Sequence, residues 1–279
     1  MAVCDPYLDR KAALLKSLSE LSPLAIAFSG GVDSSVLCHA AVAVLGDKAC
    51  AVIADSASLP RRELIAARET AIEIGIELVE LRTDEQLDPA YQSNQGDRCY
   101  FCKAALFRAL DEWRQERAIP FVALGEIADD AFDDRPGQRA AQEHGVQAPL
   151  AQAGFSKQDV RRYAAEAGLN VADKPASACL ASRIPVGTVV SVEALAQVEA
   201  AENALMDLGL SVLRVRHQGS HARVELGAED LVLAEREPGA LGPALASAGF
   251  ETHELARYLS PFERLSANTA LQAGSPDQH

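Results

Sequence analysis

The sequence predicts an α/β fold in which a doubly wound parallel sheet is followed by a smaller α+β domain. In the first half of the chain, four short and largely apolar runs alternate with helical patterns, and the runs cover residues 23–28, 50–54, 76–81 and 120–124. Such runs are typical of strands that are covered on both faces. Because strands that alternate with helices are joined by right-handed crossovers, we expect a parallel sheet with ligands at the carboxyl ends of its strands.

The pattern divides the chain into four parts. Helices are expected at 9–21, 34–45, 60–74 and 100–117, and together with the strands they form an α/β domain over 1–175. Residues 174–185 are too Pro-interrupted for a helix, so we interpret 176–190 as a cysteine-bearing linker. A small α+β domain follows at 191–266, and the polar segment 267–279 is expected to be a disordered tail. The elements expected in the small domain are a helix at 191–208, β runs at 212–216 and 222–226, helices from 229 and near 242–248, and a short run at 253–258.

Composition narrows the possible functions. The 279 residues are 48% hydrophobic, which suffices for one large core or two moderate ones, and their formal net charge is −14. Such an acidic chain is not expected to attract phosphate backbones or anionic membranes, so we expect a small-molecule substrate, no nucleic acid and no membrane partner. Since the sequence shows neither a membrane-spanning run nor a signal peptide, we expect a cytoplasmic protein.

A Gly-Gly loop joins the first predicted strand to the first helix of the sheet domain. Its two glycines leave room for close approach of a phosphate, and the backbone N–H groups that follow lie at a helix N-terminus, where an anion is favoured. The alternative is an ordinary turn capped by Asp33 or Ser34. The loop lacks the Gly-Lys-Ser/Thr ending of a Walker A motif. We predict that it binds phosphate groups through Ser29, Gly30, Gly31, Asp33, Ser34 and Ser35. The loop resembles the SGGxDS signature of the ATP-pyrophosphatase superfamily, which implies that these are the phosphates of ATP.

Two further strand ends point to the same crevice. Asp55 and Ser56 follow the second predicted strand, and Gly125 follows the fourth. We expect these residues to contribute to ATP binding, although each alone is also typical of a turn or a helix cap.

Three cysteines form a candidate reactive or metal site. Cys99 and Cys102 have the C-x-x-C spacing that lets two thiolates share one metal or cluster, and Cys179 lies in the Pro-bounded segment. Three protein ligands leave one coordination position of a metal open for chemistry, whereas a structural zinc site needs a fourth protein ligand. We expect the flanking cations to lower the thiol pKa values; they are Arg98, Lys103 and Arg183.

The other cysteines are assigned different roles. Cys38 lies in a predicted helix and Cys50 begins an apolar strand, so both are interpreted as buried packing residues. Cys4 is interpreted as a terminal residue without a function. A C-x-x-C pair can also lie at a helix start without binding anything.

Taken together, these segments resemble the LarE family of ATP-dependent sulfur transferases, within the ATP-pyrophosphatase (PP-loop) superfamily. The Ser29–Ser35 loop matches the superfamily signature SGGxDS. One departure is Ile127, where the family often has a polar residue. The matching blocks are residues 28–35, 54–64, 98–103, 133–137, 174–183 and 212–217.

The resemblance implies an enzyme of nickel-pincer nucleotide synthesis. Such proteins use ATP and Mg²⁺, here near Asp33, to adenylate a carboxylate of pyridinium-3,5-biscarboxylic acid mononucleotide, and then convert it to a thiocarboxylate. In family members with three cysteines, the resemblance implies a [4Fe-4S] cluster that carries an extra sulfide. In this sequence its ligands would be Cys99, Cys102 and Cys179. The alternative is sacrificial donation of sulfur by Cys179 itself. We also expect a homo-oligomer, with a sulfide donor or cofactor-maturation proteins as possible partners.

In the second domain we then expect a site for the substrate phosphate. Arg214 and Arg216 alternate with apolar residues, which places both guanidinium groups on one face of a strand, unless that face is merely solvated. Glu202 and Asp230 are candidate acidic ligands for a metal, with a surface charge and a helix cap as the alternatives. His217 and His221 could join the phosphate site.

Three alternatives remain at this point. A tRNA-thiolating PP-loop enzyme would share the cysteines but needs a basic surface. NAD or GMP synthetases fit the loop but leave the cysteines unexplained. A nucleotide-binding module without catalysis would not release pyrophosphate.

Overall fold

The computed structural model describes residues 5–132, 136–174, 177–236 and 238–259. The chain forms two compact units, Met1–Cys179 and Leu180–His279. Our predictions for Cys4, for residues 133–135 and for the tail 267–279 lie outside the described residues.

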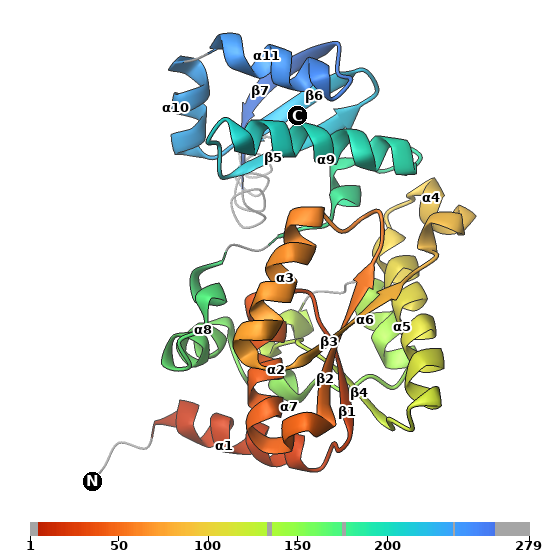
Figure 1. The fold of residues 1–279 in the computed structure, drawn as a ribbon, viewed down its shortest axis with the longest axis vertical. Coiled ribbons are helices and arrows are strands. Elements are labelled where there is room, and N and C mark those ends of the chain that lie inside the picture. The colour runs from red at the N-terminus through yellow and green to blue at the C-terminus, as the bar shows by residue number, and fades with distance from the viewer. Residues whose placement is uncertain (1–4, 133–135, 175–176, 237, 260–279) are drawn as a thin grey trace, which may run out of the picture. The chain divides into compact units, whose positions relative to one another are not determined.

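The first unit is built on a parallel four-stranded sheet in the order β3-β2-β1-β4 (Figure 1). Its register pairs Leu24 of β1 with Ala49 of β2 on one side and with Phe121 of β4 on the other. The predicted parallel α/β fold is therefore confirmed. The strands are β1 (Leu24–Ala27), β2 (Ala49–Asp55), β3 (Glu77–Arg82) and β4 (Phe121–Leu124).

Helices follow the strands as the sequence predicts, with additional short ones after β3 and β4. The unpredicted helices are short or end near glycines, and α8 begins at a side-chain cap on Ser156. The helices of this unit are α1 (Pro6–Ser19), α2 (Val32–Leu45), α3 (Arg61–Ile74), α4 (Pro89–Ser93), α5 (Arg98–Glu116), α6 (Pro136–Glu143), α7 (Pro149–Gln152) and α8 (Lys157–Glu166).

Helices cover both faces of this sheet, because alternate residues of β1 enter different cores. Leu24 and Ile26 pack into a core that includes side chains of α1, α2, α3 and α8. Ala25 and Ala27 face the opposite side, where α5 and α6 contribute Phe107, Leu110 and Ala140 (Figure 1). Burial on both faces explains why the residues of β1 are uniformly apolar, whereas β3, at the edge of the sheet, is partly exposed and carries charged residues. Cys38 and Cys50 are buried in these cores, as predicted.

The second unit is a small α+β domain with its own core. In its sheet, ordered β5-β6-β7, β6 runs antiparallel to β5 and parallel to β7. Leu205, Val215 and Leu245 are among the side chains that form the core beneath it. Within the described part of the predicted non-helical segment before this domain, residues 174 and 177–185, there is one short 3₁₀ turn, Leu180–Arg183. The elements are α9 (Val192–Asp207), β5 (Leu213–Gln218), β6 (His221–Leu226), α10 (Ala228–Arg236), α11 (Pro238–Ser247) and β7 (Thr252–Arg257).

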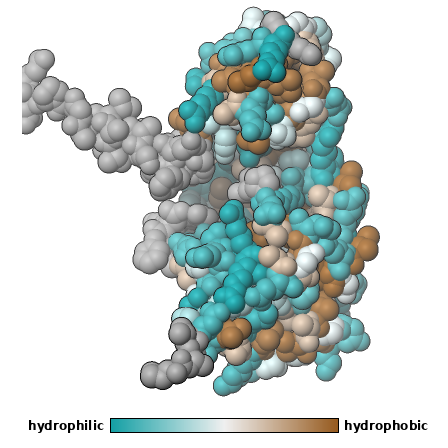
Figure 2. Space-filling view, turned by 90° about the vertical axis from the view of Figure 1, so that its left-hand side faces the viewer, coloured by the Kyte–Doolittle hydropathy of each residue, from teal (hydrophilic) through white to brown (hydrophobic). Residues whose placement is uncertain are grey.

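Hydrophilic residues cover much of the face shown in Figure 2, as expected for a chain with 24% charged residues. Within the described residues, no helix is both long and apolar enough to cross a membrane.

Candidate functional site

The Gly-Gly loop lies at the carboxyl end of β1, directly before α2. Gly30 has a φ of +69°, a conformation that L side chains rarely adopt, and a Cβ built there would lie 3.0 Å from the Cβ of Ala67 in α3. Gly31 is the N-cap of α2, and because it has no side chain it cannot accept a hydrogen bond from the first N–H groups of the helix. The loop therefore presents the backbone N–H groups of a helix start, which is the geometry that binds an anion.

Serine hydroxyls fix the shape of this loop. The Ser35 hydroxyl donates to the carbonyl of Gly31 at 2.9 Å, and the Ser34 hydroxyl donates to the same carbonyl at 3.1 Å. The backbone N–H of Ser29 donates to Ser34 Oγ at 3.3 Å. The predicted serine donors thus also brace the loop from within.

Gly125 brings the end of β4 against the same loop. A Cβ at this position would lie 2.7 Å from the backbone nitrogen of Ser34, closer than any side chain can approach. Only glycine lets the end of β4 lie this close to the first turn of α2. Ile127, beyond it, is buried, so it does not act as a polar contact.

Asp33 is paired with a lysine that sequence reasoning missed. Lys157 Nζ lies 2.8 Å from both carboxylate oxygens of Asp33. Lys157 is the first residue of α8, a position where a positive charge is unfavourable for the helix dipole, and this could have marked it as functional.

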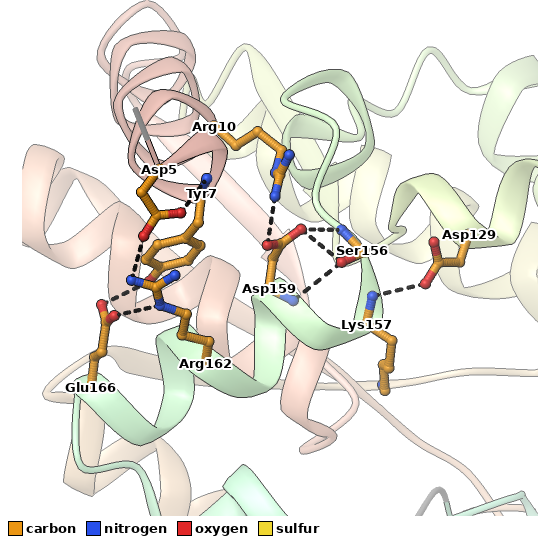
Figure 3. Close-up of polar contacts among 9 residues, drawn as sticks. All are labelled: Asp5, Tyr7, Arg10, Asp129, Ser156, Lys157, Asp159, Arg162 and Glu166. Atoms are coloured by element: carbon orange, nitrogen blue, oxygen red, sulfur yellow. Dashed lines mark hydrogen bonds and ion pairs between the residues drawn. The ribbon is translucent and has the colours of Figure 1, made fainter. Parts of the chain in front are cut away.

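The start of α8 is held firmly in place, as Figure 3 shows. Ser156 and Asp159 form a reciprocal capping box, and Arg10 of α1 donates to Asp159 at 2.8 Å. The backbone N–H of Lys157 donates to the Asp129 carboxylate at 2.8 Å, which ties α8 to the segment after β4. These contacts fix the base of the Lys157 side chain.

A second lysine, Lys174, also contacts the loop. Lys174 Nζ donates to the carbonyl of Gly30 at 3.2 Å and to Glu63 of α3 at 2.7 Å. Lys157 and Lys174 therefore bring two positive charges to the Gly-Gly loop of an otherwise acidic chain.

Asp55 and Ser56 lie at the end of β2, as predicted, and both are contacted by Arg61. This arginine pairs with the Asp55 carboxylate, and it donates to the Ser56 carbonyl at 2.7 Å. Ser58, two residues further, is buried and hydrogen-bonded to the hydroxyl of Tyr91.

The three predicted cysteines lie in one region of the first unit. Burial raises the pKa of the Cys102 thiol to about 12, and the nearby charges of Glu85, Cys179 and Cys99 contribute to the rise. Cys99 is exposed, and Cys102 and Cys179 are partly buried. Among the described residues, no group of three His, Cys, Asp or Glu side chains is arranged to hold a metal ion.

The expectation that flanking cations lower the thiol pKa values is wrong for Cys102. Arg98 donates instead to Asn94 at 2.7 Å, and Arg183 pairs with Glu202. Lys103 does oppose the rise, but burial lowers its own pKa. Burial therefore outweighs the neighbouring positive charge at Cys102.

In the second unit, Arg214 and Arg216 lie on the face of β5 opposite the buried Leu213 and Val215, as predicted. Arg216 donates to Glu225 at 2.9 Å and to the Ser182 carbonyl at 2.8 Å. Burial lowers the pKa of Arg214, and the neighbouring charge of Arg183 adds to this effect. The strand thus carries a compact group of guanidinium side chains.

The two acidic residues suggested as metal ligands make structural hydrogen bonds. Glu202 is buried, accepts two hydrogen bonds from Arg183 and receives the N–H of Val215 at 3.0 Å. Asp230 accepts the N–H groups of Ser211 and Val212. Both carboxylates therefore hold elements of this unit together.

His217 and His221 have neutral partners. His217 lies 3.0 Å from the side-chain oxygen of Gln197, and His221 lies 2.8 Å from the hydroxyl of Thr252.

The sheet order and the Ser-Gly-Gly loop at the carboxyl end of β1 define the class: an α/β protein of the PP-loop type. No family model matches the chain. It is 36% identical over 218 residues to pyridinium-3,5-bisthiocarboxylic acid mononucleotide synthase of Lactiplantibacillus plantarum, which covers 78% of this chain and 79% of that protein. The chain belongs to the LarE family, of which that synthase is a member.

Two other proteins are similar over the same extent. The uncharacterized protein slr1717 of Synechocystis is 41% identical over 78% of this chain and 81% of its own length. The uncharacterized protein MJ0830 of Methanocaldococcus jannaschii is 28% identical over 76% of this chain and 81% of its own length.

Proposed function

We propose that this protein is an ATP-dependent sulfur transferase. It adenylates a carboxylate of pyridinium-3,5-biscarboxylic acid mononucleotide and converts it to a thiocarboxylate. The observation that carries the proposal is that Cys99, Cys102 and Cys179 lie in the same unit as the Gly-Gly loop, in a chain that is 36% identical to a bisthiocarboxylic acid mononucleotide synthase.

Activation of the carboxylate comes first. A carboxylate oxygen of the substrate attacks the α-phosphorus of ATP, an O–P bond forms, and the bond to the β-phosphate breaks, so that pyrophosphate leaves. Loop N–H groups and the two lysines stabilise the negative charge on the departing phosphates. Asp33 is the residue proposed to bind Mg²⁺, which requires Lys157 to transfer from Asp33 to a phosphate.

Sulfur transfer follows. A sulfur nucleophile attacks the activated carbonyl carbon, a C–S bond forms, and the C–O bond breaks to release AMP. The thiol donor set fits a [4Fe-4S] cluster by its chemistry, because thiolates ligate such clusters and three of them leave one position open. Bound there, the cluster supplies a sulfide that is nucleophilic at neutral pH. Cys99, Cys102 and Cys179 are the residues that would hold it.

Substrate binding is assigned to the guanidinium group on β5. Arg214 and Arg216 suit the phosphate of a mononucleotide, since guanidinium groups bind phosphate in a bidentate manner. The net charge of −14 argues against a tRNA substrate. We also expect a cytoplasmic homo-oligomer.

The test is anaerobic purification followed by measurement of iron, sulfide and EPR signal, with pyrophosphate and thiocarboxylate measured in the same preparation. We expect about four irons per chain for a [4Fe-4S] cluster and several thiocarboxylates per chain. Cys99→Ala should lose the iron and the sulfur transfer but keep ATP binding. Cys38→Ala, a substitution in the core, should keep the iron and the sulfur transfer.

The sacrificial alternative gives a different result. Protein without iron, with one turnover and loss of the Cys179 sulfur by intact mass, would exclude the cluster and retain the sulfur-transferase function. No pyrophosphate release with the biscarboxylic acid mononucleotide would contradict the proposed function itself.

A further inference from the structure

Two buried hydroxyl groups tie the end of β2 to the segment that precedes the cysteine-bearing helix α5. Ser58, which follows β2, and Tyr91 of α4 are 3% and 1% exposed, and their hydroxyls are hydrogen-bonded to each other. The side-chain amide of Gln86, which lies between β3 and α4, donates to Ser58 Oγ at 3.3 Å and to Tyr91 Oη at 3.4 Å. Polar side chains from both sides of β3 in the sequence therefore meet in the interior.

The paired hydroxyls fix one arrangement of these segments. Buried apolar side chains tolerate alternative packing, whereas a buried hydroxyl loses free energy unless it keeps its hydrogen-bond partner. A hydrogen-bonded group in the interior therefore specifies which segments lie together and makes that region rigid. Here it holds α4 against the chain that follows β2.

The other end of α4 contacts the first residue of α5. Asn94, the C-cap of α4, is 1% exposed and has a left-handed φ of +53°, and its N–H donates to the Tyr91 carbonyl at 3.2 Å. Its side-chain oxygen accepts a hydrogen bond from the Arg98 guanidinium at 2.7 Å. α4 lies beside α5 (Figure 1), and Cys99 directly follows Arg98. A series of hydrogen-bonded residues thus leads from Ser58 to the helix start that carries Cys99.

This connection lies at the edge of the sheet where the Gly-Gly loop also lies. In a parallel sheet, each connecting helix begins near the carboxyl end of the strand before it. Because α5 connects the parallel strands β3 and β4, its first turn belongs to that edge. Ser58 follows the carboxyl end of β2, shortly after Asp55. The connection therefore holds the cysteine-bearing turn beside a strand end that is proposed to bind ATP.

We propose that Tyr91 is a positioning residue for sulfur transfer. Its hydroxyl, held by Ser58, fixes the first turn of α5, so that the sulfur nucleophile at Cys99 and Cys102 reaches the activated carbonyl carbon. This inference rests on the proposed function and concerns only its second step, since the Gly-Gly loop and its two lysines serve the first. Such positioning matters because a displacement of about 1 Å can reduce a rate about 100-fold.

Tyr91→Phe tests the proposal, since it removes the hydroxyl and keeps the ring. The full chain is assayed anaerobically with ATP and the biscarboxylic acid mononucleotide, and thiocarboxylate and pyrophosphate are measured in the same reaction. We expect the ratio of thiocarboxylate to pyrophosphate to fall about 10- to 100-fold. Activation continues while the sulfur nucleophile is misplaced, and water attacks the same carbon instead, which releases AMP and restores the original carboxylate.

Hydrogen–deuterium exchange of the iron-free protein provides a readout that does not depend on activity. Loss of one ordinary hydrogen bond should speed exchange about 2- to 10-fold where the local structure opens. We expect this effect in residues 98–106, at the start of α5, and no change in residues 110–116, at its end. A merely structural loss would speed exchange across the whole core and slow both reaction steps together.

Tyr7→Phe is the matched control, because it also removes the hydroxyl of a buried tyrosine, in this case one that donates to Glu166 of α8 at 2.8 Å. It should change neither the product ratio nor the exchange in α5. Ser58→Ala breaks the bond between Ser58 and Tyr91 from the other side. It should reproduce both effects, so it replaces Tyr91→Phe if that variant does not fold.

The outcomes separate this inference from the proposed function. An unchanged product ratio in Tyr91→Phe, or equal slowing of both steps, would overturn the role of Tyr91 and leave the sulfur-transferase function standing. Unchanged exchange at the start of α5 would overturn it as well. Absence of thiocarboxylate from the wild type itself would instead contradict the proposed function, and the inference with it.

Discussion

Lys157 and Asp33 are 124 residues apart in the chain, yet the lysine ammonium group lies 2.8 Å from both oxygens of the aspartate. The pair joins the first turn of α8 to the first turn of α2, directly beside the Gly-Gly loop. It is partly exposed, so it contributes little to stability. Its position at the loop suggests that its role is to bind phosphate.

Lys157→Met is therefore expected to impair ATP binding without impairing the fold. Loss of one charged hydrogen-bond donor to phosphate should weaken ATP binding about 10- to 100-fold, while the melting temperature changes little. Isothermal titration with ATP and a thermal melt measure the two effects. Lys48→Met is the control, because Lys48 is exposed and lies just before β2, at the amino end of the strand. Equal ATP affinity in both variants would contradict the assignment.

Gly125→Ala should disturb the Gly-Gly loop. Its new Cβ would meet the backbone nitrogen of Ser34 at 2.7 Å, so the loop has to move, at a cost of about 1–3 kcal/mol for overpacking. A displacement of about 1 Å can reduce a rate about 100-fold, and we expect a loss of this order in pyrophosphate release. In contrast, Gly239→Ala in α11 meets no atom within 4 Å and should leave the rate unchanged. A fully active Gly125→Ala enzyme would show that the loop does not bind the phosphates.

Arg183→Met should destabilise the second unit by about 3–5 kcal/mol, because it leaves the buried Glu202 carboxylate without its ion-pair partner. Urea unfolding followed by circular dichroism measures the loss. The double variant Arg183→Met/Glu202→Met should recover much of it, since no buried charge then remains. Arg223→Met removes an exposed pair with Glu254 and should cost only about 0–1 kcal/mol. Similar losses of stability in Arg183→Met and Arg223→Met would contradict the prediction that breaking a buried ion pair costs more than breaking an exposed one.

Glu166 should make stability depend on acid pH. Hydrogen bonds from Tyr7 and Arg162 lower its pKa from 4.5 to about 2. Because the folded state holds the proton of Glu166 less tightly than the unfolded state does, the ionised carboxylate stabilises the fold. Its contribution to the free energy of unfolding is complete above about pH 4.5 and is lost as the pH falls toward 2. Thermal melts of the wild type should therefore show a steeper decline over this range than melts of Glu166→Gln. Parallel curves for the two proteins would contradict the prediction.

Much of the fold could be predicted because its signals are local. The apolar residues of β1 and of most of β2 indicate burial on both faces, and the structure covers both with helices. The short helices after β4 were not predicted, because polar and small residues interrupt the apolar periodicity by which a helix is recognised. The parallel pairing of β7 with β6 depends on a crossover through α10 and α11, which strand pattern alone does not reveal.

The site was predictable where residues are neighbours in sequence and not where the fold brings them together. The Gly-Gly loop was identified from one short segment, whereas Lys157 and Lys174 reach it from more than 120 residues away. The predicted pKa direction at Cys102 was wrong because burial, which the sequence does not show, outweighs the neighbouring charge of Lys103, and because Arg98 donates to Asn94 instead.

Each unit has its own core, built on Leu24 and Ile26 in the first and on Leu205 and Val215 in the second. Chains with two separate cores often depart from all-or-none unfolding, so a single transition temperature need not describe this protein. Differential scanning calorimetry should then resolve two endotherms. Substitutions at Gly125 should shift one of them and substitutions at Arg183 the other. The protein would thus carry an internal reference, because the unshifted endotherm reports that the rest of the molecule is intact.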